Sequence, residues 1–145
     1  ESIQDFYRMF ALTEGLIAEL AASRATAEEI AQLRLINAQI EALDAGDASH
    51  AGAYRQLNVA FHTALHAMAH SPVVCDRQSA NFELSDFYIV QTCGFRAHLD
   101  RVAGEHQAVI EAIAARQPDA ARAAAQAHID SVSQTVSAAL GQNGA

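Results

Sequence analysis

The chain contains only two prolines, and each stands where a helix is expected to begin. Ser71-Pro72 places a capping residue before a proline at the first helical position, and Pro118 opens another helical segment. Proline inside a helix removes a hydrogen bond and clashes with the preceding turn, so long proline-free stretches can remain helical. Their residues are mostly strong helix formers, and no Asn-Gly or Asp-Gly turn lies between alternating apolar runs. The sequence therefore predicts an all-α fold.

Periodic apolar residues and helix-end signals divide the chain into six expected helices. Thr26-Ala-Glu-Glu29 matches a capping box, in which the threonine hydroxyl and the glutamate satisfy free backbone N–H groups. Gly46 is expected to end the next helix, since glycine tolerates the left-handed conformation. The expected helices cover about residues 5–23, 27–44, 48–70, 72–99, 101–116 and 118–140, with a weak point at Gly94 and a frayed tail. Short connections between them predict an antiparallel bundle.

The length, charge and cysteine content of the chain argue against several classes of function. The 145 residues, 51% of them hydrophobic, suffice for one domain with its own core. Nine basic and 17 acidic residues give a net charge of -8, which argues against direct binding to nucleic acid or an anionic membrane. No apolar run reaches the length of a membrane span, which is about 20 residues. Two cysteines, Cys75 and Cys93, are expected to be reduced thiols in a cytoplasmic protein.

Four polar residues, Asn58, His62, His66 and His70, are spaced four positions apart on one expected helix. Such a series rotates by about 40° per step, because four residues advance slightly more than one turn. With Phe61 at the centre of the buried stripe, Asn58 and His62 lie at its edge, and His70 points away from the core. Asn58 and His62 can therefore share an internal site. His66 is expected near the edge of the bundle, packed there or supporting the site.

Two later histidines interrupt apolar stripes of their own. His106 falls among Val102, Val109, Ile110 and Ile113, and His128 falls among Ala121, Ala125, Val132 and Val136. A buried imidazole needs a hydrogen-bond partner or a metal, so two interpretations stay open. Either these are ordinary core histidines, or they share one metal site with Asn58 and His62. Three imidazoles and an amide oxygen would suit a divalent transition metal.

A helical-bundle metalloenzyme is the alternative use of such a site. It would need a general base, and His62-Thr-Ala-Leu-His66 lacks the glutamate of the His-Glu-x-x-His metalloprotease motif. Glu105, beside His106, is expected to face outward. A third hypothesis is a metal-free scaffold or dimerisation bundle.

The order of three motifs resembles the C-terminal effector domain (FCD type) of FadR-type GntR bacterial transcription regulators. These motifs are Asn58-Val-Ala-Phe-His62, Glu105-His106-Gln-Ala-Val-Ile-Glu-Ala-Ile113 and Ala121-Arg-Ala-Ala-Ala-Gln-Ala-His128. The 22-residue spacing from His106 to His128 (128 − 106) fits the same pattern. The resemblance covers nearly the whole chain. It implies a bundle of six or seven antiparallel helices around a central metal or ligand cavity.

The resemblance also implies the contents of that cavity. Asn58, His62, His106 and His128 would bind the metal, with zinc expected first and nickel, iron or manganese as alternatives. A small organic acid would be the effector. Independently of the resemblance, Arg96 is a candidate to contact its carboxylate, because a guanidinium binds carboxylates well, and an ordinary surface arginine is the alternative interpretation. The family more usually has aspartate at the position of Asn58. A neutral amide there leaves a more positive site, which favours an anionic effector.

The remaining expectations concern the whole regulator. Residues 1–145 would form one effector-binding and dimerisation domain, without enzymatic activity, in a cytoplasmic homodimer. A winged-helix DNA-binding domain is expected upstream, and operator DNA would be bound only through it. The acidic charge of this chain agrees with that division of roles.

Overall fold

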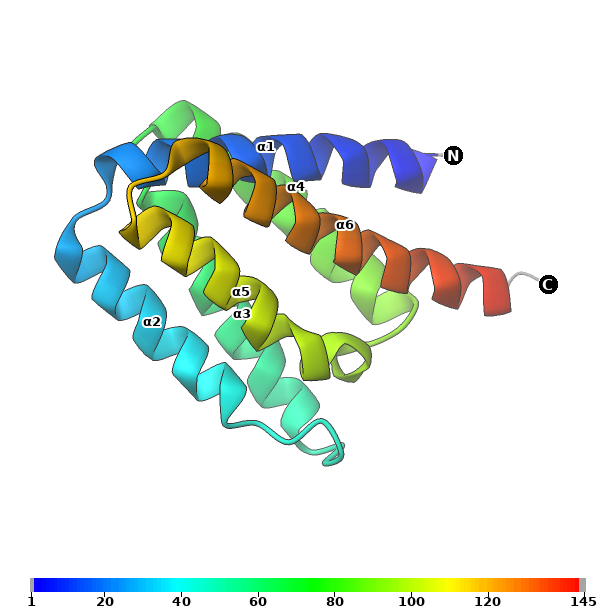
Figure 1. Ribbon diagram of the computed structural model, residues 1–145. Helices are drawn as coiled ribbons and strands as arrows, with labels where there is room; N and C mark the ends of the chain where they lie inside the picture. The colour runs from blue at the N-terminus through cyan, green and yellow to red at the C-terminus, as the bar shows by residue number, and fades with distance from the viewer. Residues whose placement is uncertain (1, 144–145) are drawn as a thin grey trace.

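The computed structural model describes residues 2–143 and shows helices joined by short connections (Figure 1). Within these residues there is no strand, and the α-helices are α1 (Ser2–Arg24), α2 (Ala27–Glu41), α3 (His50–Ala67), α4 (Pro72–Gln91), α5 (Leu99–Ala114) and α6 (Pro118–Asn143). A short 3-10 helix, η1 (Phe95–His98), precedes α5. The all-α prediction is confirmed.

The helix starts follow the local signals in the sequence. Thr26 and Glu29 form the complete capping box, with hydrogen bonds of 2.8 and 3.1 Å between side chains and backbone N–H groups. Pro72 and Pro118 begin α4 and α6. Ser71 makes no capping hydrogen bond with its side chain, so proline geometry alone marks the start of α4.

The main departure lies near Gly94. The predicted helix over 72–99 ends at Gln91, because Gly94 adopts a φ of 73° that a continuing helix cannot contain. The chain then turns into η1, which carries Arg96. At the other end of the chain, α6 continues to Asn143, so the fraying predicted after residue 140 is wrong up to that point. Residues 144–145 of the predicted tail lie outside the described residues.

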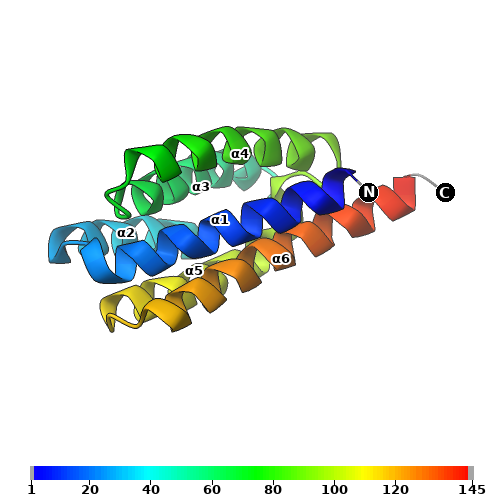
Figure 2. The same ribbon diagram turned by 90° about the horizontal axis from the view of Figure 1, so that it is seen from above.

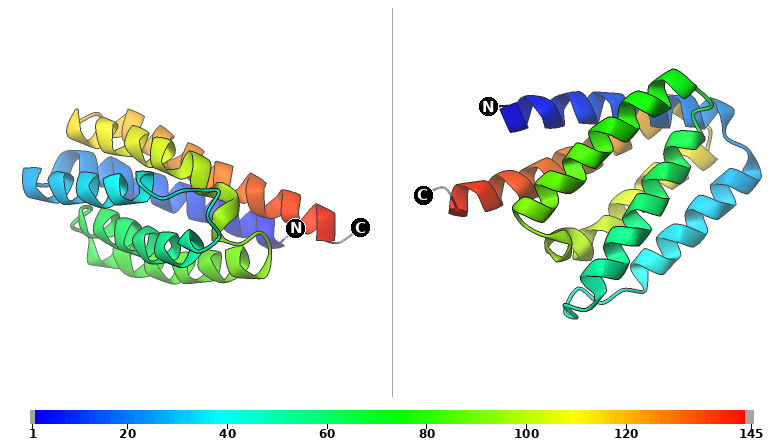
Figure 3. Two further views of the ribbon diagram at one scale, coloured as in Figure 1. Left: turned by 90° about the horizontal axis from the view of Figure 1, so that it is seen from below. Right: turned by 180° about the vertical axis from the view of Figure 1, so that it is seen from behind.

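The helices pack as three layers of two, which Figure 2 shows from above: α3 with α4, α1 with α2, and α5 with α6. Figure 3 gives the same arrangement from two further sides, with α1 and α6 running side by side. The middle layer opens between α1 and α2, which diverge from their shared turn (Figure 1). Side chains from α3 and α5 can therefore meet in the interior.

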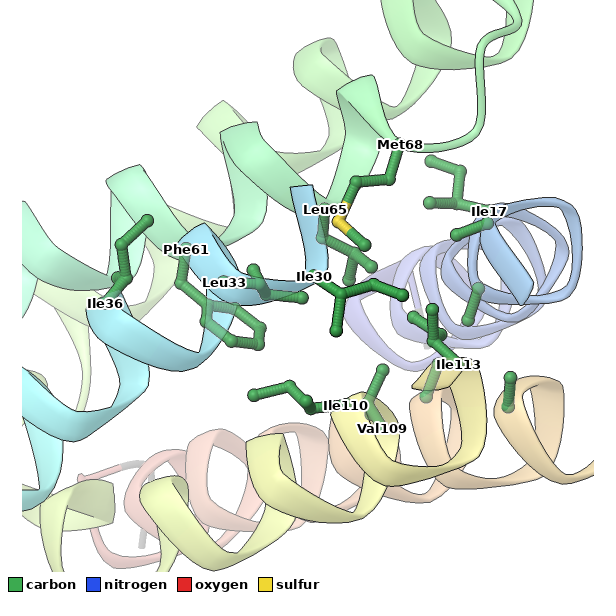
Figure 4. Close-up of a cluster of buried hydrophobic side chains, with 14 of the residues drawn as sticks. Ile17, Ile30, Leu33, Ile36, Phe61, Leu65, Met68, Val109, Ile110 and Ile113 are labelled. Carbon is green, nitrogen blue, oxygen red and sulfur yellow. The ribbon is translucent and has the colours of Figure 1, made fainter. Parts of the chain in front are cut away.

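The main core is aliphatic. Figure 4 shows side chains of α1, α2, α3 and α5 that point toward one another, among them Ile17, Leu33, Leu65 and Ile110. A smaller cluster joins the start of α1 to α6 and includes Phe6, Tyr7, Phe10, Ile129 and Val136. None of the helices in the described part is long and apolar enough to cross a membrane.

Helix α4 is attached differently from the others. Its buried residues are Gln78 and Ser85, both polar, and each is hydrogen-bonded to α1. The Gln78 amide donates to the carbonyl of Phe10 at 3.2 Å and to a carboxylate oxygen of Glu14 at 2.9 Å. The hydroxyls of Ser85 and Tyr7 lie 3.1 Å apart. Because the buried part of α4 is polar, hydrogen bonds contribute an unusual share of its attachment.

Candidate metal centre

Three of the predicted ligands meet in the interior from three different helices. His62 of α3, His106 of α5 and His128 of α6 are buried, and each offers a ring nitrogen within 4.8 Å of the others. The ring centroids of His106 and His128 lie 4.7 Å apart, and that of His62 lies 5.4 and 5.6 Å from them. Imidazole nitrogens bind transition metals at about 2.0–2.1 Å. Nitrogens this close can therefore surround a single ion.

A hydrogen bond orients each of the three rings, and every acceptor comes from a different helix than its ring. The Nδ1 atoms lie near Glu14 (from His62, 2.6 Å), Asn37 (from His106, 3.2 Å) and Glu105 (from His128, 2.7 Å). Because Nδ1 carries the proton in this arrangement, Nε2 of each ring has a free lone pair. Metal-binding histidines are held in the same manner, which sets their tautomer and orientation.

His106 provides the sharpest test of whether a metal fits. The Asn37 amide nitrogen donates to the carbonyl of Ala103 at 3.0 Å, so its oxygen accepts and His106 Nδ1 donates. The other ring nitrogen, Nε2, is buried and has no hydrogen-bond partner among the described residues. Leaving such an atom unpaired costs about 1–3 kcal/mol. A metal ion would pair it, so the residues present fit the group that the family implies.

The surroundings of His106 and His62 favour the neutral form of both imidazoles. Phe61 stacks on His106 with 3.7 Å between ring centroids and an interplanar angle of 3°. Burial lowers the pKa of His106 well below its ordinary value, and the neighbouring His128 and His62 lower it further. Burial also lowers the pKa of His62, against the opposing effect of Glu14. Neutral imidazoles are the form that binds metals.

The predicted fourth ligand, Asn58, is buried one helical turn before His62. It lines the same cavity as His62 and His128. This cavity measures about 30 Å³, and its walls are largely apolar, with Phe10, Tyr54, Phe82, Ile89, Phe95, Ile129 and Val132 among them. A space of this size holds about two water-sized groups, such as an ion and one coordinating group. Metal binding by Asn58 stays a prediction.

Glu14 is a central residue that helix-by-helix inspection of the sequence missed. Its carboxylate is 1% exposed and accepts hydrogen bonds from His62, His66 (2.8 Å) and Gln78. Burial alone would raise the pKa of Glu14, but His66 and His62 beside it hold that pKa well below the ordinary value. The signal was present in the sequence, because Glu14 stands one turn after Phe10 on the apolar stripe of α1.

The other two histidines of the Asn58–His70 series, His66 and His70, differ in their burial. His66 is not at the bundle edge but 3% exposed, and it supports the site by donating to the carboxylate that also orients His62. His70 is exposed and pairs with Glu29 at 2.9 Å, so its predicted outward direction is confirmed.

The expected outward position of Glu105 is wrong. Its side chain is 25% exposed and accepts hydrogen bonds from His128, His98 (2.8 Å) and Ser131 (2.7 Å). Burial alone would raise the pKa of Glu105, but these three donors outweigh it and hold the pKa far below its usual range. Both η1 and α6 supply the donors. A single-helix projection cannot anticipate such neighbours.

The structure does not bring Arg96 to the histidines. Its guanidinium donates to the carbonyls of Ala45 (2.7 Å) and Gly46 (2.8 Å) and so fastens the connection between α2 and α3. It is not among the residues that line the cavity. Because its donors are used elsewhere, we do not carry Arg96 into the proposed effector site.

Comparisons with known proteins agree with this fold. The family model of the FCD domain matches residues 5–131. A search of the curated proteins gives no match. Among solved structures, E. coli McbR/YncC has a TM-score of 0.70 and 15% sequence identity, covering 98% of this chain and 65% of that chain. The chain therefore spans about two thirds of that protein, and at this identity the likeness shows the fold alone. Because the family model matches most of its length, the chain belongs to the FCD domain family.

Proposed function

We propose that this chain is the ligand-sensing domain of a bacterial transcription regulator and that it binds one divalent metal through His62, His106 and His128. The observation that carries the proposal is the unpaired, buried Nε2 of His106, which faces two further imidazoles whose Nδ1 atoms are already hydrogen-bonded. Membership of the FCD family supports the regulatory role. Zinc is the first candidate, because a set of three imidazoles with an open position suits it well.

The charge of the site favours an organic acid as the effector. A bound metal would supply open coordination positions for carboxylate oxygens. The Asn58 amide is neutral, and imidazoles bind a metal in their neutral form, so these ligands would not offset the charge of a divalent ion. Glu14 and Glu105 each face an Nδ1 atom on the outer side of a ring, so neither occupies the space between the rings. An effector carboxylate can take that place.

The polar contacts around His62 provide a route from the site to the rest of the regulator. Glu14 holds His62 with one carboxylate oxygen and Gln78 of α4 with the other. An effector that shifts the His62 ring therefore changes the contacts of α4. In a homodimer this movement would alter the spacing of two attached winged-helix domains, which alone would contact operator DNA.

The metalloenzyme alternative is less well supported. Each carboxylate near the cavity is engaged by other side chains: Glu14 and Glu105 by histidines, and Asp86 by Arg55 at 2.6 Å. A general base needs to reach a substrate proton, and these groups are turned to other donors. We therefore propose sensing and not catalysis.

Metal analysis of the purified, tag-free domain tests the proposal. After incubation with zinc at neutral pH and removal of excess metal, mass spectrometry should find one ion per chain. His106→Leu should keep the helical circular dichroism spectrum and lose the metal. The matched control is His70→Leu, which replaces the exposed histidine of the Asn58–His70 series and should keep the metal.

Two outcomes would count against the metal site. A wild-type domain without stoichiometric metal contradicts it directly. Equal metal content in His106→Leu and wild type would mean that the metal binds elsewhere in the domain.

A further inference from the structure

The inner cavity is too small to hold an organic acid. Its volume of about 30 Å³ has room for an ion and one coordinating group. Pockets that bind small molecules usually measure about 300–1,000 Å³. The greater part of any effector must therefore lie outside the space between the histidines.

A second, larger pocket adjoins the inner cavity. Its volume is about 540 Å³, and it opens to solvent between the end of α4, η1, α5 and α6. Cys93 and Thr135 line both spaces, so these two side chains form the partition between them. The remaining walls are Thr92, Ala97, Arg101, Gln134, Ala138 and Ala139. None of these described residues is acidic, although the chain as a whole has a net charge of -8.

Arg101 is the cation of this outer pocket, and its guanidinium is half exposed. One nitrogen donates to Thr135 Oγ1 at 2.9 Å and to His98 Nδ1 at 3.2 Å. The nearest carboxylate oxygen paired with it, on Asp100, is 3.9 Å away, which is too long for a hydrogen bond. The guanidinium therefore retains donors that can bind an anion.

Two other arginines lie near the inner cavity, and both are committed to other partners. Arg55 binds the carboxylate of Asp86 through two nitrogens, at 2.6 and 3.4 Å. Arg96 donates to the carbonyls of the connection between α2 and α3. Of the three guanidinium groups, Arg101 is the one placed to receive a carboxylate.

A chain of hydrogen bonds joins Arg101 to the candidate metal ligand. His98 accepts from Arg101 at Nδ1 and donates from Nε2 to Glu105, which in turn accepts from His128. His98 and His128 both line the inner cavity. A ligand bound at Arg101 is thus in contact with the network that orients His128.

We propose that the outer pocket is a second carboxylate subsite and that the effector is a diacid. One carboxylate occupies the space between the histidines, and the other binds Arg101 across the partition formed by Cys93 and Thr135. This inference rests on the proposed function, since the inner carboxylate is held at the metal. It identifies Arg101 as the residue that selects diacids over monoacids.

Calorimetric titration of the zinc-loaded domain tests this. Succinate, glutarate and adipate are compared with butyrate, pentanoate and hexanoate, their monoacids of equal length. At least one diacid should bind about tenfold more tightly than its monoacid, the usual effect of a charge-assisted hydrogen bond. Arg101→Gln should remove that advantage, so that this variant binds the diacid and its equal-length monoacid with similar affinity. Arg101→Lys should restore part of that advantage.

The matched control is Arg8→Gln, which makes the same charge change at an exposed position on α1. The carboxylate at Arg101 could also come from a separate molecule, and a titration of butyrate in the presence of acetate tests this. If acetate tightens butyrate binding in wild type but not in Arg101→Gln, the outer subsite is supported and the diacid effector is contradicted.

Metal content measured on the same samples separates this inference from the proposed function. A wild-type domain that fails to load zinc contradicts both. A loaded domain that binds equal-length monoacids and diacids alike contradicts the outer subsite alone. The same holds if Arg101→Gln and Arg8→Gln weaken diacid binding equally.

Discussion

Each of the three converging histidines depends on one polar side chain from another helix. Glu14, Asn37 and Glu105 accept the Nδ1 protons and leave the Nε2 atoms free to bind a metal. The arrangement leaves only one imidazole nitrogen, on His106, fully buried and unpaired in the described residues. Without a metal, this unpaired nitrogen destabilises the fold, and a bound metal would pair it.

The three converging histidines could be predicted from the sequence, but their hydrogen-bond acceptors could not. His106 and His128 stand out because each breaks an apolar stripe at helical spacing. Asn37 breaks a stripe in the same way, between Leu33 and Ile40, yet the sequence does not show which ring it would meet. Its partner is 69 residues away. Pairings at such separations depend on how the helices pack and leave no local pattern.

Replacement of Glu14 tests the role of its buried carboxylate. Glu14→Gln removes the charge and leaves three donors around a single amide oxygen, which should lower the free energy of unfolding by about 2 kcal/mol or more at pH 7. Urea denaturation in the presence of a chelator measures the loss. Glu28→Gln, at an exposed position on α2, should stay within about 0.5 kcal/mol of wild type.

The same variant has an expected pH dependence. The pKa of Glu14 in the folded protein is lowered below the ordinary value of 4.5, so the ionised form is the stabilising one. The advantage of wild type over Glu14→Gln should therefore be complete above the unfolded pKa. It should shrink as the pH falls through the folded pKa. An advantage that grows on acidification would contradict an ionised Glu14.

At the scale of elements, α4 is the helix with the weakest hydrophobic attachment. Its buried residues, Gln78 and Ser85, are polar, whereas α1 buries Phe10, Ile17 and several alanines. Helices that bury little apolar surface open at lower free energy than the rest of a fold. We therefore expect α4 to be the helix that responds to occupancy of the histidine site.

Hydrogen exchange measures this difference directly. Amides of α4 should exchange faster than those of α1, and Gln78→Ala should speed exchange in α4 by about tenfold because Glu14 loses a donor. Exchange in α5 should be unchanged. Ser79→Ala serves as the control, since its hydroxyl bonds only within α4, to Cys75. Equal protection of α1 and α4 would argue against this assignment.

For the whole molecule, the sequence was sufficient to predict the architecture but not all connections. Caps such as Thr26 and Glu29 act over three residues, so helix starts are encoded locally. Arg96 shows the opposite case, because it binds carbonyls 50 and 51 residues away across the bundle. Its guanidinium suggested a ligand contact, because this group binds carboxylates well. Only the packing of η1 against the α2–α3 connection reveals its structural role.

The proposed homodimer has a candidate contact on α1. Met9, Leu12 and Leu16 follow helical spacing and are 48%, 59% and 39% exposed. Helix α1 lies between α4 and α6 on one face of the molecule (Figure 2). A stripe of exposed apolar side chains in the middle of a face is typical of an interface between protein chains.

Sedimentation equilibrium tests this contact. Wild type should sediment as a dimer, and Leu12→Glu should shift it to monomer, because a buried charge in an apolar interface is strongly unfavourable. Leu35→Glu is the control, since Leu35 is similarly exposed on α2. Identical dimerisation of the two variants would place the interface elsewhere.

The residues that surround the three histidines and those that line the outer pocket are largely different, and this difference bears on how the domain can diversify. The outer pocket is walled in part by Ala97, Ala138 and Ala139, three small side chains that take no part in the hydrogen bonds around the rings. Larger or polar residues could replace them without disturbing the histidines. A protein engineer could therefore alter the proposed outer subsite while leaving the proposed metal centre unchanged.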